Sequence, residues 1–126
     1  MPDFEKTLLD EVLQAVDRHT ASVSFRVTHY AAGMQVRPHA HAKHQLIYAV
    51  HGVMGVRTAA GHWVVPPSRA LWMPAGTVHA VRCMGEVHMH SLYIHPDAAP
   101  ELLQDCSVVA VSPLLRELIR AAVAVL

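Results

Sequence analysis

Three histidines in the chain are spaced as ligands of one metal ion would be. His39 and His41 are one residue apart, and His79 follows the turn-forming segment Pro74-Ala75-Gly76. Side chains alternate across an extended strand, so His39 and His41 would project from the same face and reach one ion. Neutral imidazoles suit transition metals, whereas Mg and Ca prefer oxygen ligands. The spacing predicts a divalent transition metal (Zn, Ni or Fe) on this triad; the alternatives are a polar interior without an ion, or direct binding of an organic ligand.

Two polar residues close to the first pair, Gln45 and His44, are possible additional groups of the site. Three protein ligands leave a coordination position open for water or a small ligand. Gln45 is a neutral, weak oxygen donor, so we expect it to contact the ion or to hydrogen-bond to a bound water or ligand. His44 faces away from His41 if the strand continues, and it would reach the ion only through a kink after His41.

Four aromatic residues are candidates for the wall of a ligand pocket. Small-molecule sites are mostly apolar and aromatic, with a few polar groups placed among them. Packing in the structural core is the alternative for most of these side chains. The four residues are Tyr48, Trp63, Trp72 and Tyr93.

The other reactive residues indicate no catalytic set. His88 and His90 repeat the one-residue spacing and predict either exposed edge histidines or a surface metal clip. Glu86 is the only acid between Met34 and Pro96, so this stretch offers no obvious general base other than histidine. The two cysteines lack C-x-x-C spacing, which favours reduced thiols. Whether the chain is an enzyme stays open, and a binding role is favoured.

A strand-rich segment must position these residues. Short runs of Val, Tyr, Trp and Met between Gly and Pro turns predict antiparallel strands over residues 22–111. Apolar residues three and four apart predict a helix within 1–20. A second helix is predicted over 112–126, with Ser112 as N-cap and Pro113 at its first position. The wide apolar face of this second helix suggests either a chain that continues further or contact with a second subunit.

Composition is that of one compact domain spanning residues 1–126. The chain is 52% hydrophobic and 16% charged, and its ten basic residues are matched by ten acids. A free-standing nucleic-acid binder usually shows a clustered excess of Lys and Arg, so direct DNA binding by this chain is not expected. No secretory signal and no run of ~20 apolar residues occurs, which predicts a cytoplasmic protein that does not enter a membrane.

The histidine frame resembles the two motifs of the cupin superfamily over residues 33–83. The first, G-x5-H-x-H-x3,4-E-x6-G, differs only where Gln45 replaces the usual glutamate. In the second, G-x5-P-x-G-x2-H-x3-N, Ser68 replaces the first glycine and Cys83 the final asparagine. The matching residues are Gly33, His39, His41, Gly52, Pro74, Gly76 and His79. The resemblance implies an all-β fold, a double-stranded β-helix (jelly-roll) barrel with a metal site inside and a short helix at each end.

A narrower resemblance links the chain to the N-terminal cupin domain of AraC-type transcriptional regulators. It is carried by the segments 44–54, 63–76, 91–94 and 112–119. In that family a separate C-terminal pair of helix-turn-helix units reads DNA, and no such region lies in this chain. The resemblance implies a domain that senses a small molecule or metal ion, with the helix over 112–126 as transmitter and homodimer contact.

Two hypotheses for function follow. The first is the effector- or metal-sensing domain of an AraC-type regulator, which controls a DNA-binding region outside this chain. The second is a small metal-dependent cupin enzyme, such as an Fe(II) dioxygenase, because oxygen activation needs mainly the metal and open coordination positions. Sequence alone identifies neither effector nor substrate, because pocket shape decides both.

Overall fold

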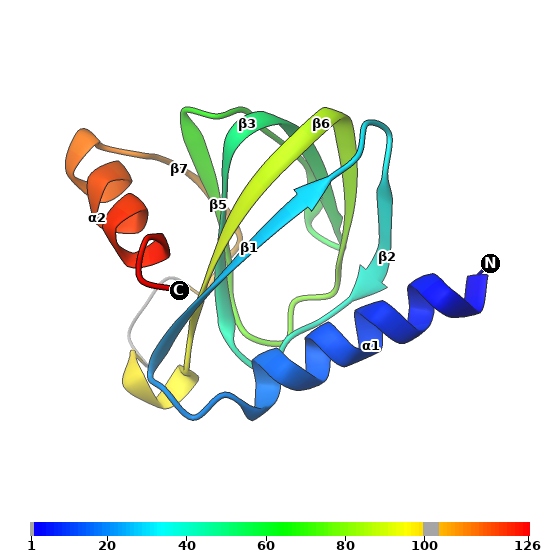
Figure 1. Cartoon of the computed structure of the whole chain (residues 1–126), viewed down its shortest axis with the longest axis horizontal. Coiled ribbons are helices and arrows are strands. Elements are labelled where there is room, and N and C mark those ends of the chain that lie inside the picture. The colour runs from blue at the N-terminus through cyan, green and yellow to red at the C-terminus, as the bar shows by residue number, and fades with distance from the viewer. Residues whose placement is uncertain (1, 100–103) are drawn as a thin grey trace.

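Seven strands and two α-helices make up the computed structural model, which describes the backbone of residues 2–99 and 104–126 and the side chains of residues 9–99 and 104–126. A curled antiparallel sheet lies between one helix at each end of the chain (Figure 1). The elements are α1 (Pro2–Arg18), β1 (Val23–Tyr30), β2 (Gln35–His39), β3 (His44–Thr58), β4 (Gly61–Val65), β5 (Arg69–Met73), β6 (His79–Ile94), the 3-10 helix η1 (Pro96–Ala98), β7 (Ser107–Ala110) and α2 (Pro113–Val123).

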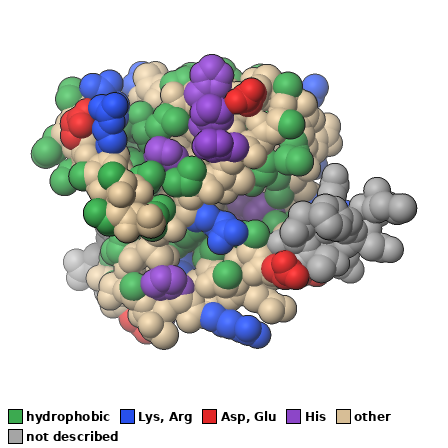
Figure 2. Space-filling model, in the orientation of Figure 1, with side chains coloured by type: hydrophobic (Ala, Val, Ile, Leu, Met, Phe, Trp, Pro, Cys, Tyr) green, Lys and Arg blue, Asp and Glu red, His purple; other side chains and the backbone are tan. Residues whose placement is uncertain are grey.

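Two long strands, β3 and β6, hold the barrel together. They pair with each other along most of their length, and each also pairs with two shorter strands, β4 and β5 for β3 and β1 and β2 for β6. Both strands bend at glycines with positive φ, Gly52 at 86° and Gly85 at 77°. A Cβ on Gly52 would collide with the carbonyl oxygen of Glu86, so the close approach of the two strands requires glycine there. Histidine side chains gather on the outer surface of the barrel (Figure 2).

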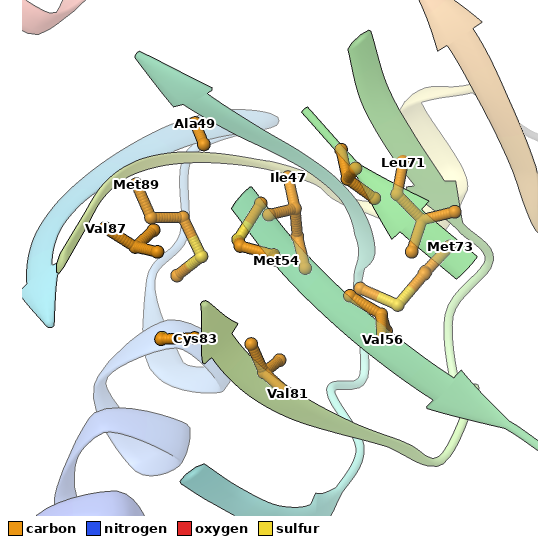
Figure 3. Close-up of a cluster of buried hydrophobic side chains, with 11 residues drawn as sticks. Ile47, Ala49, Met54, Val56, Leu71, Met73, Val81, Cys83, Val87 and Met89 are labelled. Atoms are coloured by element: carbon orange, nitrogen blue, oxygen red, sulfur yellow. The ribbon is translucent and has the colours of Figure 1, made fainter. Parts of the chain in front are cut away.

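The interior of the barrel is an apolar cluster (Figure 3). Along β3, alternate residues face opposite ways: Ile47 and Ala49 belong to this inner cluster, whereas Leu46 and Tyr48 pack in a second cluster under α2. The members of the inner cluster are Ile47, Ala49, Met54, Val56, Val65, Leu71, Met73, Val81, Cys83, Val87 and Met89. Both faces of this part of β3 are therefore buried.

The terminal helices cover different parts of the barrel. α1 has Val16 buried and Leu9, Val12 and Leu13 half-buried, as its apolar spacing predicts. At α2, the Oγ of Ser112 accepts the N–H of Leu115, which confirms Ser112 as the N-cap. The buried side chain of Ile119 then anchors α2 on the second cluster. Among the described residues, the helices are too short or too polar to cross a membrane.

Candidate metal and ligand site

Three histidines from separate parts of the chain converge on one point. His39 ends β2 and pairs with His79 at the start of β6, whereas His41 lies in the loop between β2 and β3. One ring nitrogen from each of the three lies within 4.8 Å of the others. Their ring centroids are 4.2 Å (His39–His79), 5.2 Å (His39–His41) and 5.5 Å (His41–His79) apart. The rings meet although His41 lies beyond the end of the strand that was expected to carry it together with His39.

Backbone carbonyls fix two of the three rings. His39 donates its Nδ1–H to the carbonyl oxygen of Arg37 at 2.7 Å, and His79 donates its own to the carbonyl of Thr77 at 2.9 Å. A carbonyl oxygen can only accept, so Nδ1 of each neutral ring carries the proton and Nε2 keeps its lone pair. Hydrogen bonds of this kind orient histidines that bind metal ions in proteins.

The three imidazoles are neutral near pH 7. Burial, reinforced by the neighbouring His79 and His39, lowers the pKa of His41 to about 3. Burial also lowers the pKa of His79 to about 4, against the opposing effect of its hydrogen bond to Thr77. The pKa of His39 is likewise lowered by burial. Metal ions bind the deprotonated form of histidine, so at neutral pH no proton has to leave before an ion binds.

Gln45 lies beside the triad and is 3% exposed. Its Nε2 lies 3.2 Å from the Oγ of Ser91 and 3.3 Å from the hydroxyl oxygen of Tyr93. Within the described part of the chain, Gln45 Oε1 and His41 Nδ1 are both buried without a hydrogen-bond partner. Buried polar atoms are nearly always satisfied by protein, water or a bound group. Two such atoms beside three histidines fit a bound ion with its water or ligand.

The triad and Gln45 line a small cavity that adjoins a wider groove. The small cavity has a volume of about 40 Å³ and also receives the side chain of Tyr93. One water needs roughly 10–15 Å³ of such space, so the cavity has room for an ion and a few ligand atoms. The groove, of about 1080 Å³, shares part of its wall with the small cavity, including Leu9 and Val12 of α1. We call these two spaces the inner cavity and the outer groove.

Comparison with known proteins shows the family of this chain. Residues 23–124 match the family model described as the AraC-like ligand binding domain. The chain belongs to this family. It is also 34% identical over 101 residues to the HTH-type transcriptional regulator NimR of Escherichia coli K12, an alignment that covers 80% of this chain and 37% of NimR. The AraC-like domain thus spans little more than a third of that relative.

Solved structures show the same fold at low sequence identity. ToxT from Vibrio cholerae O395 aligns with a TM-score of 0.63 and 7% identity over 82% of this chain and 45% of its own. A cupin superfamily protein from Desulfitobacterium hafniense DCB-2 aligns with a TM-score of 0.56 and 18% identity, over 60% of this chain and 70% of its own. KdgF from Halomonas sp. aligns with a TM-score of 0.56 and 22% identity, over 61% of this chain and 72% of its own. The predicted all-β cupin barrel with a helix at each end is confirmed.

The other predicted site residues of the AraC-like domain lie in different surroundings. Tyr93 lines the inner cavity, and its ring centroid is 5.2 Å from that of His41. His44 is outside the triad: its Nδ1 accepts the N–H of Ala75 at 2.9 Å. Tyr48 and Trp72 face the second cluster under α2, on the other side of the sheet. Trp63 packs against the inner cluster without lining the inner cavity.

Contacts between α1 and the loop that carries His41 were not foreseen. The carboxylate of Asp17 accepts the N–H of Ala42 at 3.1 Å, and the ammonium group of Lys43 donates to the carbonyl of His19 at 2.6 Å. Lys43 is 3% exposed, an unusual burial for a lysine. These contacts join residues that are 24 and 25 positions apart in the sequence, and no sequence motif predicts them. The AraC-like domain thus ties the end of α1 to its triad.

A second group of histidines lies on the outer face of the sheet. His88 on β6 pairs with His29 on β1 and with His51 on β3, and its ring stacks on that of His29 at 4.3 Å. Glu86 lies 2.6 Å from His88 Nε2. We call His29, His51 and His88 the surface histidine row. His90 follows His88 by two residues on β6, and its ring centroid is 6.5 Å from that of Tyr48.

Proposed function

We propose that this AraC-like domain senses an effector inside its barrel, where His39, His41 and His79 hold a divalent transition metal ion. The convergence of three neutral, buried imidazoles carries this proposal. A bound ion would act as a Lewis acid with at least one position open to a small ligand. Three nitrogen ligands favour Zn, Ni or Fe(II) over Mg or Ca.

The proposed output is control of a DNA-binding region outside this chain. Its support is family membership and the relative whose name describes a helix-turn-helix transcriptional regulator. A ligand that binds one arrangement of barrel and α2 more tightly than another shifts that equilibrium by its difference in affinity. α2 suits the role of transmitter because it packs through Ile119 on the sheet face opposite the inner cluster.

We further propose that α2 forms a homodimer contact. Ile119 faces the barrel, whereas Leu114 and Leu118 are 71% and 58% exposed. These two leucines are four residues apart and so lie side by side along the helix. Exposed apolar side chains in a stripe, on a helix that packs on the barrel through another side, are typical of a protein–protein contact. A second copy of the chain would bury the stripe through a symmetric helix pair.

Elemental analysis of untagged protein tests the metal site. We expect near one transition-metal ion per chain in the native protein. The triple variant His39→Ala, His41→Ala, His79→Ala should lose it. A matched control replaces the three members of the surface histidine row, His29, His51 and His88, by alanine and should keep the ion. Equal metal content in both triple variants would refute the triad as the binding site.

The identity of the ion separates the sensor from the remaining enzyme hypothesis. Zinc or nickel in the isolated protein would support the sensor. Iron, together with oxygen consumption that the triad variant lacks, would support an Fe(II) dioxygenase on the same three histidines. For the sensor, transcription from a promoter bound by the full-length regulator should respond to effector in the native protein and not in the triad variant.

A further inference from the structure

We propose that the effector is a small organic carboxylate and that Arg26 on β1 binds its carboxylate group. The inference rests on the proposed function, because it concerns the ligand that enters the barrel. It comes from the charge, register and shape of the inner cavity.

The register of β1 places Arg26 on the inner face of the barrel. Arg26 pairs with Ser91 of β6, and Ser91 contacts Gln45. Along β1, Ser24, Arg26, Thr28 and Tyr30 are half-buried. Of the residues between them, Val27 and His29 are exposed and Phe25 is half-buried. Arg26 also lines the inner cavity together with the triad. Arg26 and the three histidines therefore line the same space.

No described Asp or Glu lines the inner cavity beside its one positive charge. Arg26 is the one charged residue among those that line it, and the three histidines are neutral. Neither the inner cavity nor the outer groove is lined by a described Asp or Glu. Asp17 lines neither space and accepts the N–H of Ala42, but its charge, like that of Arg26, acts on Tyr93 in the cavity wall. A divalent ion on neutral ligands would add two further positive charges, because Gln45 replaces a carboxylate. An anion would balance this charge.

Arg26 is also free to bind an anion. It forms no ion pair with a carboxylate among the residues that the structure describes. A half-buried guanidinium pairs most favourably with a carboxylate through two parallel hydrogen bonds. A neutral ligand of the same shape would leave the arginine without this partner.

The amide of Gln45 supplies a second polar contact. Its Nε2 has two hydroxyl partners, Ser91 and Tyr93, while Oε1 has none. Hydroxyl groups donate as well as accept, so the amide can rotate by half a turn and keep both partners. The unpartnered atom would then be an N–H donor. Such a donor beside Arg26 would suit a carboxylate oxygen.

The shape of the two spaces predicts an apolar body on this ligand. The inner cavity, at about 40 Å³, admits little more than a carboxylate group. Its wall continues into the outer groove through four apolar side chains that line both spaces, Leu9, Val12, Val36 and Val81. A carboxylate placed inside would therefore direct the rest of the molecule along an apolar surface, which favours a hydrocarbon or aromatic body.

Paired probes test the inference on the full chain at neutral pH. Benzoate and hexanoate are compared with benzamide and hexanamide by titration calorimetry, with zinc-loaded and metal-free protein. We expect at least one acid to bind about 10-fold or more tightly than its amide, because a charge-assisted hydrogen bond contributes roughly 1.5–3 kcal/mol. Arg26→Met should remove this preference, and Arg26→Lys should keep part of it. Arg69→Met, which removes an exposed arginine of β5 that lines neither space, should bind like the native protein.

Two outcomes would overturn the inference. One is an amide that binds as well as its acid, or the absence of binding by either acid at 10 mM, roughly the weakest affinity worth calling specific. The other is a folded Arg26→Met protein, judged by its thermal unfolding, that keeps the preference for acids. Metal content is measured on the same samples. Bound zinc without a preference for acids would refute only the carboxylate effector. A preference for acids without bound metal would refute only the metal site of the proposed function.

Discussion

His39 and His79 face each other across the β2–β6 pair, and each donates Nδ1–H to the carbonyl of the residue two positions before it. The same local device thus orients two rings that are far apart in the sequence. Arg37 lies where the pairing of β2 with β6 is irregular, between Val36 and His39, and Thr77 follows the turn at Ala75 and Gly76. The third ring, His41, lacks such a hydrogen bond at Nδ1 and is positioned by its loop instead.

Replacing Gln45 by glutamate should strengthen metal binding. The change restores the carboxylate of the general cupin motif next to the triad, and a fourth, charged ligand should raise zinc affinity about 10-fold or more. It should also weaken benzoate binding, because the added negative charge repels a carboxylate. Zinc competition with a chelating dye measures the first effect. Gln14→Glu, at an exposed position of α1 that lines neither space, is the control and should change neither value.

Removing the carboxylate of Asp17 should loosen the loop that carries His41. In Asp17→Ala the N–H of Ala42 loses its partner, and we expect about 1 kcal/mol less stability and roughly 10-fold weaker zinc binding. Asp10→Ala, a change at an exposed position of the same helix, is the control. If both variants bind zinc alike, α1 does not support the metal site.

A glutamate in the stripe on α2 should separate the proposed dimer. Leu118→Glu places a charge in the apolar contact, and we expect the dimer dissociation constant to rise about 100-fold or more. Sedimentation velocity over a range of concentrations measures it. Arg116→Glu introduces the same side chain at an exposed position on another side of the helix. A native chain that stays monomeric at high concentration would disprove the dimer.

Two glycine variants should separate steric overlap from backbone strain. Gly33 and Gly52 both have positive φ, 78° and 86°, but an added Cβ meets nothing within 4 Å at Gly33 and the Glu86 carbonyl at Gly52. Gly33→Ala should cost about 1–2 kcal/mol. Gly52→Ala should cost a further 1–3 kcal/mol or more, because β3 and β6 must move apart. Chemical denaturation measures both; equal losses would mean that the strands yield easily.

Tyr30 should make stability fall at high pH. Burial raises its pKa to about 12, with Tyr93 and Cys83 adding to the rise and Arg26 opposing it. In the unfolded chain the pKa of tyrosine is about 10. The stabilising contribution of Tyr30 is therefore complete below about pH 10 and declines as pH rises toward 12, by up to about 1.4 kcal/mol per pH unit. The ultraviolet absorbance of ionised phenol should include a titration near pH 12 that comes from Tyr30. Tyr30→Phe should lack that phenol and lose less stability over the same range.

Local patterns predicted the pair His39 and His41, the two helices and the strand-rich middle, because each depends on spacing over a few residues. His79, 40 positions beyond His39, could be added only through the cupin motifs. The surface histidine row could not be predicted, since His29, His51 and His88 become neighbours only through the pairing of three strands. The sequence also could not predict that Tyr48 and Trp72 lie on the side of the sheet that faces α2. Both faces of β3 are buried because α2 covers one of them, so apolar character there does not distinguish the cavity side from the helix side.

The pairing of His39 with His79 also bears on how long the folded domain would persist once it holds an ion. The two residues stand 40 positions apart in the chain, the difference of 79 and 39. An ion held by both is a reversible crosslink, and closing a loop of that length removes about 4 kcal/mol of disorder from the unfolded chain if the crosslink survives there. Newly made protein can gain this only after synthesis has passed β6. Release of the proposed ion would remove this crosslink between β2 and β6.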